Sequence, residues 1–311
     1  MKHFLTSLTA LLLTAAPVFA QTGSAPAADT LKINRDDRPG LNPGFADGGA
    51  LHKDKKKKGK SVWVGSGGIH YDNGTSDSTV HNFEVQFGML DLGVNSLVDN
   101  TAYPSPGVLP SAQANNEFFH TDAAHANKDL FSLRQSKSIN VNIYPILLKA
   151  RLLSTPNQKL TLATGLGLQL YNFRFTKPVT YHSDPTTFVA LDTISFSKNK
   201  LALNYLTVPL MLNAKTRLAG PASGKNSYWL VYGVGVSGGY LLSSWTKQVS
   251  DERGKEKNHD PFNFSKTNFC VNGEIGLDGY FRLFASYQLT ALHDSYLDQH
   301  PFSIGIRFLG L

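Results

Sequence analysis

Apolar residues alternate with small or polar residues over several segments of this chain, and the clearest of them runs from 228 to 242. Tyr, Leu and Val occupy one set of alternate positions there, and Gly and Ser occupy most of the other set. The stretch carries no charge, so its hydropathy alone would also suit a transmembrane helix. The strict two-residue period, with small residues on one face, favours a β-strand with an apolar face.

Eight segments of this kind follow one another from residue 83 to the C-terminal end. They are 83–95, 138–153, 159–175, 199–217, 228–242, 269–277, 281–289 and 302–308. Several change phase midway, as at Leu170–Tyr171, which predicts a bulge or a strand that leaves a membrane. The hairpin between 269 and 289 should place Ile275 opposite Leu283, with a three-residue turn.

The connections between these segments alternate between long and short. Long ones cover 98–131, 177–198 and 247–263, whereas 155–158 and 278–280 are tight turns. This asymmetry is typical of bacterial outer-membrane barrels, whose strands must close on themselves because unpaired backbone groups are not tolerated in hydrocarbon. We therefore predict an all-β fold, a single antiparallel transmembrane β-barrel with eight strands. A ten-strand barrel, with a further strand inside 98–131, and a soluble periplasmic sandwich are the alternatives.

The residues before the predicted barrel divide into two parts. Residues 1–20 have the basic start, apolar run and small-residue cleavage site of a signal peptide. Residues 21–60 are rich in Ala, Gly, Pro and Lys and predict a disordered periplasmic segment. The barrel domain would span 61–311, with its wall from about 83 and an extra strand at 61–71 that pairs locally or plugs the base.

Composition supports export to a membrane. Charged residues make up 17 % of the chain, whereas Gly (27), Phe (19) and Tyr (12) are plentiful, and the single cysteine, Cys270, excludes an intramolecular disulfide. Much of the net charge of +7 lies in one basic tract, formed by Lys53, Lys55, Lys56, Lys57, Lys58 and Lys60. We interpret the tract as a solvated spacer, with contacts to lipid phosphates, peptidoglycan or an acidic partner as the alternative. Nucleic acid is not an expected partner of an exported chain.

Four short motifs resemble the PorT-like outer-membrane β-barrel domain family. They are Phe87–Asn95, Asn140–Pro145, Leu206–Leu210 and Ser303–Phe308. The resemblance covers about residues 61–311 and implies a small barrel with a low-complexity periplasmic lead. It also implies a role as a secretion accessory, and it supplies no catalytic residues.

Charged residues on the predicted inner faces define the main candidate site. Glu84, Glu274, Arg282 and Arg307 should lie in a barrel just wide enough for its own side chains, so we expect them to pair with one another. Glu274 would lie diagonal to Arg282, within reach of a salt bridge. A lumen that conducts solute is the alternative interpretation.

Aromatic residues near the strand ends predict the girdles that mark the two membrane surfaces. They are Tyr171, Phe173, Phe175, Tyr228, Trp229, Tyr240 and Trp245.

Catalytic and metal-binding patterns are weak in this sequence. His293, Asp294, Ser295 and His300 lie where a lipid-modifying barrel enzyme would carry its active site, but a catalytic arrangement needs a base next to a nucleophile, which spacing does not show. His120, Asp122 and His125 lack a strong metal-ligand spacing. We therefore predict no enzyme, no cofactor and no metal. The expected role is structural or surface-interacting, with outer-membrane lipid, lipopolysaccharide and a periplasmic or cell-envelope protein as partners, and a narrow pore as the alternative.

Overall fold

The computed structural model describes residues 61–65, 68–72, 83–103, 118–121, 125–219, 228–279 and 281–309. The predicted signal peptide, the segment 21–60 and its lysine tract lie outside the described residues.

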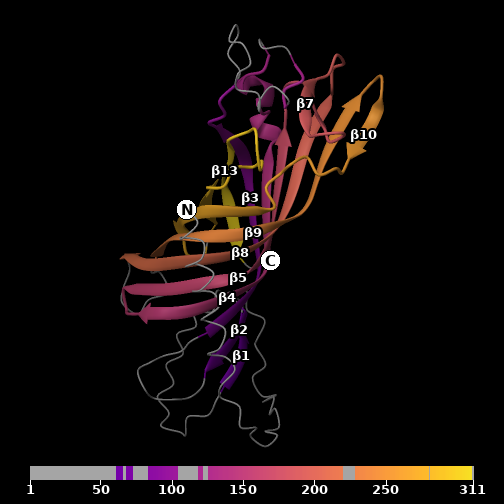
Figure 1. Cartoon of the computed structure of the whole chain (residues 1–311). Helices are drawn as coiled ribbons and strands as arrows, with labels where there is room; N and C mark the ends of the chain where they lie inside the picture. Colours follow the sequence, from indigo (N-terminus) through magenta and orange to yellow (C-terminus); the bar gives the residue numbers. More distant parts are fainter. Residues whose placement is uncertain are drawn as a thin grey trace, which may run out of the picture. The chain divides into compact units, whose positions relative to one another are not determined.

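Eight strands form a closed antiparallel ring (Figure 1). They are β3 (Phe83–Asp99), β4 (Ile139–Ser154), β5 (Gln158–Arg174), β8 (Lys198–Ala219), β9 (Tyr228–Ser250), β11 (Thr267–Leu277), β12 (Arg282–Gln288) and β13 (Gln299–Leu309). The ring closes because β3 pairs with both β4 and β13. The all-β, antiparallel prediction is confirmed, and each of the eight predicted segments forms one strand of the ring. Since β3 pairs directly with β4, the residues between them add no strand to it.

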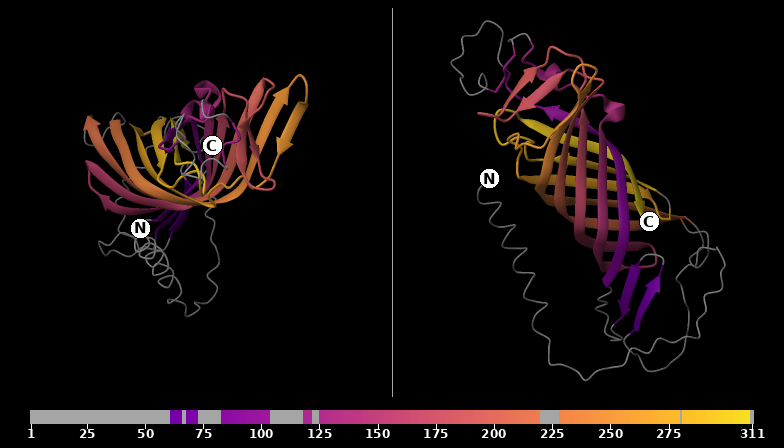
Figure 2. Two further views of the ribbon diagram at one scale, coloured as in Figure 1. Left: turned by 45° about the horizontal axis from the view of Figure 1, so that its top comes forward. Right: turned by 90° about the vertical axis from the view of Figure 1, so that its right-hand side faces the viewer.

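The two ends of the ring differ in their connections. Short connections join β4 to β5, β8 to β9 and β11 to β12 at one end, which we call the turn end. The four longer connections lie at the other end, the loop end, and Figure 2 shows their segments gathered there in its right-hand view. In the hairpin β11–β12, Ile275 faces Leu283 and Val271 faces Tyr287, as the sequence predicts. Gly279, with a φ of 80°, takes the left-handed conformation in its turn.

No bulge occurs at Leu170–Tyr171, because the registers of β5 with β4 and β8 run through these residues without a shift. The alternative, that the strand leaves the membrane there, stays a prediction. In β5 the odd-numbered residues face inward without interruption, and Gln169, Tyr171 and Phe173 are all buried. What changes along the strand is the chemistry of the interior, from polar to aromatic. The β4–β5 pair has register shifts between Ile143 and Ile146 and between Arg151 and Leu153. The β8–β9 pair has them between Asn204 and Tyr205 and between Arg217 and Ala219.

The girdle prediction is correspondingly wrong for Tyr171, Phe173 and Phe175, which are 1 %, 0 % and 3 % exposed. Tyr228 and Tyr240 do lie on the outer face, each 56 % exposed. The two tryptophans in this set, Trp229 and Trp245, are half-buried, and lysine ammonium groups lie over their rings.

The extra strand predicted at 61–71 is a hairpin of two strands, β1 (Ser61–Gly65) and β2 (Gly68–Asp72). β2 pairs with the first residues of β3, where Ile69 faces Val85 and Tyr71 faces Phe83. The hairpin is therefore an extension of the sheet at the turn end, outside the closed ring. It pairs locally, which is one of the two arrangements expected for residues 61–71.

The outer face of the ring carries large apolar side chains on all eight strands. Examples around the ring are Leu92, Leu148, Leu166, Val208, Val234, Ile275, Leu283 and Ile304, each at least 40 % exposed. The inner face is mostly polar or small at the same levels, apart from a small apolar cluster of Met89, Tyr144 and Leu147. The usual order of a water-soluble sheet is therefore largely inverted. No helix in the described part of the chain is long and apolar enough to cross a membrane.

The loop-end connections carry their own secondary structure. It comprises β6 (Val179–His182), β7 (Phe188–Leu191), β10 (Gly254–Asn258) and two 3₁₀ turns, η2 (Lys128–Phe131) and η3 (Gln135–Lys137). β6 pairs with β7, and β10 pairs with the far end of β9.

Candidate functional site

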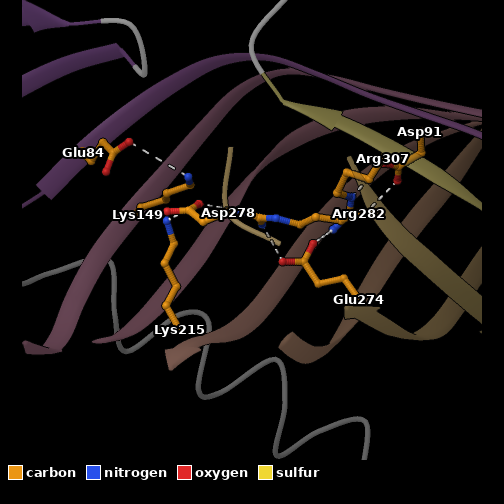
Figure 3. A network of polar contacts seen from close by, with 8 residues as sticks. All are labelled: Glu84, Asp91, Lys149, Lys215, Glu274, Asp278, Arg282 and Arg307. Atoms are coloured by element: carbon orange, nitrogen blue, oxygen red, sulfur yellow. Dashed lines mark hydrogen bonds and ion pairs between the residues drawn. The ribbon is translucent and has the colours of Figure 1, made fainter. Parts of the chain in front are cut away.

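A chain of charged side chains of alternating sign lies inside the ring at its turn-end half (Figure 3). Asp91 accepts hydrogen bonds from Arg307 at 2.7 and 2.8 Å, and Arg307 also donates to Glu274. Glu274 accepts from Arg282 at 2.8 Å. Asp278 lies 3.8 Å from Arg282 and accepts from Lys215 at 2.7 Å. These six residues, which we call the inner network, contain three acids and three bases.

The inner network contains three of the four residues singled out from the sequence. Glu274, Arg282 and Arg307 are brought together, and the diagonal contact between Glu274 and Arg282 forms as expected. Glu84 lies apart from them. It is the cross-strand neighbour of Lys149, and the two charged groups are 4.0 Å apart.

The other members were not identified by sequence reasoning. Asp91 is fully buried and faces Arg307 across the β3–β13 pair. The sequence does indicate the orientation of Asp91, because a single acid between Leu90 and Leu92 in an apolar strand must face the interior. Lys215 lies in β8 and Asp278 in the turn after β11, and only the order of the strands in the sheet shows that β8 and β11 flank the same strand, β9.

The middle of the interior is filled by amides and hydroxyls. Asn268 donates to Gln169 at 2.9 Å, and Ser303 donates to Asn95 at 2.8 Å. The enclosed space beside the inner network has a volume of only about 20 Å³, which is room for about one water molecule. Side chains of the described residues thus leave little space beside the inner network.

Glycine on the inner face of β9 makes this close packing feasible. A side chain at Gly239 would place its Cβ 2.3 Å from the amide oxygen of Asn268. A Cβ at Gly233 would lie 2.0 Å from the amide oxygen of Asn213. The alternation of Gly with Tyr and Val in this strand thus reflects a filled interior and an apolar exterior.

An aromatic core closes the interior at the loop end. Its members are buried residues of the wall strands and the loops: Phe118, Phe119, Ala126, Leu130, Phe131, Tyr171, Phe173, Phe175, Val179, Tyr181, Val189, Leu201, Leu203, Tyr205, Phe262, Phe264, Leu292 and Leu297. We call this cluster and the loops around it the loop-end lobe. It is cross-linked by polar contacts, among them a two-point ion pair between Asp192 and Arg253 at 2.6 and 3.1 Å. The described loop residues therefore pack with the inward-facing residues of the wall strands at this end of the ring.

His293, the candidate base of a rim enzyme, lies inside this aromatic core. It is 2 % exposed and stacks on Tyr181, with Phe264 at a ring distance of 4.7 Å. Neither ring nitrogen has a hydrogen-bond partner among the described residues. Burial lowers the pKa of His293 to about 3, against a smaller opposing effect of Asp99. The imidazole is thus neutral and enclosed, which is unsuited to proton transfer with a substrate.

His293 should make the stability of the loop-end lobe depend on pH. The folded pKa lies below the unfolded value near 6.5, so only the unfolded lobe takes up a proton as the pH falls. Stability should be complete above about pH 7 and fall by about 1.4 kcal/mol per pH unit between 6.5 and 3. Limited proteolysis of the loops at pH 8 and pH 5 measures this. The His293→Leu variant should lose the part of the pH dependence due to this residue, and an unchanged profile would contradict the assignment.

The structure describes only part of the weaker metal candidates. The ring of His120 stacks on Phe188 at a centroid distance of 3.9 Å. Asp122 lies outside the described residues, and no group of three or more metal-ligating side chains occurs among those described. Cys270 is a buried free thiol next to the Tyr171 hydroxyl, at 3.9 Å.

The sequence matches no protein-family model and no curated protein. The arguments for its function therefore come from its own residues.

Proposed function

We propose that this chain is a bacterial outer-membrane β-barrel with a structural or surface-interaction role. The observation that carries the proposal is the inverted ring, apolar on the outside of all eight strands and polar and filled within. A closed ring satisfies its own backbone groups, which hydrocarbon demands. Wall strands of 11 residues or more, such as β11 and β13, are long enough to cross a bilayer when tilted.

The short turns then face the periplasm and the loop-end lobe faces the outside. β3 begins at the turn end and β13 finishes there, because an even number of strands returns the chain to the side from which it started. The packed lobe presents a surface on which an envelope or external partner would bind. A secretion-accessory role remains the specialised form of this proposal that the PorT-like resemblance implies.

A narrow pore is the second candidate, and the geometry gives it less support. The inner network fills the turn-end half of the ring, and the aromatic core covers the loop end. A rim enzyme is supported still less, because His293 is enclosed.

Membrane fractionation followed by electrophoresis with and without heating tests the proposal. We expect the chain in the outer-membrane fraction, with a mobility that changes on heating. Bilayer recordings with the purified protein should show no single-channel steps. Recovery in the soluble fraction would refute the membrane assignment, and stable conductance would favour the pore.

A further inference from the structure

Four cations form a row across four neighbouring strands at the loop end. Arg174 of β5 is the register partner of Lys200 in β8. Lys200 faces Lys247 in β9, and Lys247 faces Lys257 in β10. Figure 1 shows β10 at this end. Lys198 and Lys255 both face Val249, two residues along the same strands, so they lie on the same face of the sheet. We call these six residues the basic row.

The basic row lies on the outer face of the sheet. The residues that alternate with it, such as Phe173, Leu201 and Gln248, are buried in the interior. Six residues further along β8, on the same face, lies the exposed residue Leu206, and Tyr240 is its exposed partner in β9. Asn204 and Ser243 lie between this pair and the row. The row therefore lies on the loop-end side of the apolar belt, about 20 Å along β8 from Leu206. This is the side on which the headgroups of the outer leaflet would lie if the belt meets lipid.

The cations of the row are not neutralised by acids of the chain. The strongest electrostatic effects on Lys200 come from Lys198, Lys247, Arg174 and Lys257, all cations. Partial burial and then these charges lower the pKa of Lys200, and Lys255 is the largest cause of the lowered pKa of Lys247. None of the six forms an ion pair with a carboxylate in the described part of the chain. Like charges placed directly opposite one another in a sheet reduce its stability, so the arrangement has a cost that an anionic ligand would offset.

A tryptophan lies within the row. The ammonium groups of Lys257 and Lys200 are 4.8 and 5.8 Å from the ring centre of Trp245. His259 lies beside the same ring, at a centroid distance of 5.8 Å. Tryptophan is enriched at membrane surfaces, where its ring contacts both apolar and polar groups. Cations around an interfacial tryptophan suit a ligand that has phosphate next to acyl chains.

We propose that the basic row binds the phosphate groups of lipid A in the outer leaflet around the barrel. The inference deepens the proposed function and rests on it, because it requires the apolar belt to be in lipid. The phosphates would lie among Lys200, Lys247 and Lys257, and the acyl chains would lie against the belt below. Lipid A, with its phosphates and several acyl chains, has both features in one molecule.

The test uses the full mature chain in non-ionic maltoside micelles. The probe is bisphosphorylated lipid A, compared with its dephosphorylated form and with inorganic phosphate. With Trp63 and Trp229 replaced by Phe, fluorescence reports Trp245 alone. We expect bisphosphorylated lipid A to bind more tightly than the other two probes, and its binding to weaken with added salt.

The decisive variant carries Lys200→Gln, Lys247→Gln and Lys257→Gln together. It should bind bisphosphorylated lipid A on the order of 100-fold more weakly, from three lost cation–phosphate interactions near a membrane surface. Without lipid A its unfolding midpoint should rise, because the repulsion within the row is removed. Lys159→Gln in the same Trp63→Phe, Trp229→Phe parent is the control, since Lys159 lies at the turn end, where it is 4.9 Å from the ring centre of Trp229 in the wild type. It should change the affinity less than twofold.

Equal affinity for phosphorylated and dephosphorylated lipid A would overturn the inference, as would an unchanged affinity in the triple variant. Inorganic phosphate binding as tightly as lipid A would assign the row to free anions. Each preparation is also run with and without heating. A protein without heat-dependent mobility contradicts the proposed barrel itself, whereas a heat-modifiable barrel that does not discriminate the probes contradicts only the lipid A site.

Discussion

Replacing Arg307 with methionine should destabilise the folded ring by about 3–5 kcal/mol. Arg307 is the centre of the inner network, where it contacts both Asp91 and Glu274. Asp91 is fully buried, and without Arg307 its hydrogen-bond partner among the described side chains would be the amide of Asn142 at 3.3 Å. Removing one partner of a buried ion pair leaves an uncompensated charge, which costs more than the pair itself contributes. Unfolding by guanidinium in detergent micelles, followed by tryptophan fluorescence, measures the change.

The double variant Arg307→Met, Asp91→Leu is the matched control. It removes the buried charge together with its partner and leaves the Glu274–Arg282 pair in place. Its stability should be closer to that of the wild type than the single variant is, so the two substitutions should be strongly non-additive. An Arg307→Met variant within about 1 kcal/mol of the wild type would show that the network contributes little and is open to water.

Val234→Arg should reduce stability by about 2–4 kcal/mol when the protein is folded into phospholipid bilayers. Val234 is 67 % exposed and lies near the middle of the apolar stretch of β9. If this face meets lipid, the substitution places a charge near the midplane of the hydrocarbon. Equilibrium folding into vesicles of defined chain length gives the free energy directly.

Leu218→Arg serves as the comparison for Val234→Arg. Leu218 is similarly exposed, at 56 %, but lies next to the turn end of β8. Near the interface the cost should fall to about 0–1 kcal/mol. The dependence on depth is what distinguishes a membrane-embedded ring from a water-soluble one, in which both surface substitutions should lie within about 0.5 kcal/mol of the wild type.

The wall strands could be predicted because their alternation reports two different environments. Tyr232 and Val234 on one face of β9, with Gly233 and Gly235 on the other, specify both the strand and its orientation. The hairpin register followed from matching Ile275 with Leu283. The orientation of the aromatic residues at the loop end could not be predicted in this way. Tyr171 and Phe173 are aromatic and face inward, and sequence alone does not show that the loops supply apolar partners for them.

The inner network was predictable only in part. Glu274 and Arg282 are neighbours in one hairpin, so local pairing places them together. Lys215 and Asp278 belong to separate hairpins, and their contact depends on the pairing of β8 and β11 with the two sides of β9. The basic row could not be predicted from the sequence for a related reason. Its lysines are scattered among β8, β9 and β10 in the sequence, and strand register alone brings them into line.

The pairing of β3 with β13 joins the first and last strands of the ring. Asp91 and Arg307 are 216 residues apart in the sequence, and Asn95 and Ser303 are 208 apart. This seam therefore closes only after the whole chain has been synthesised, and until then both strands present open edges that invite aggregation. The two buried polar pairs act as markers of correct closure, because a slip by one residue would turn Asp91 outward. The burial of these polar pairs thus distinguishes a correctly aligned seam from one that has slipped by one residue.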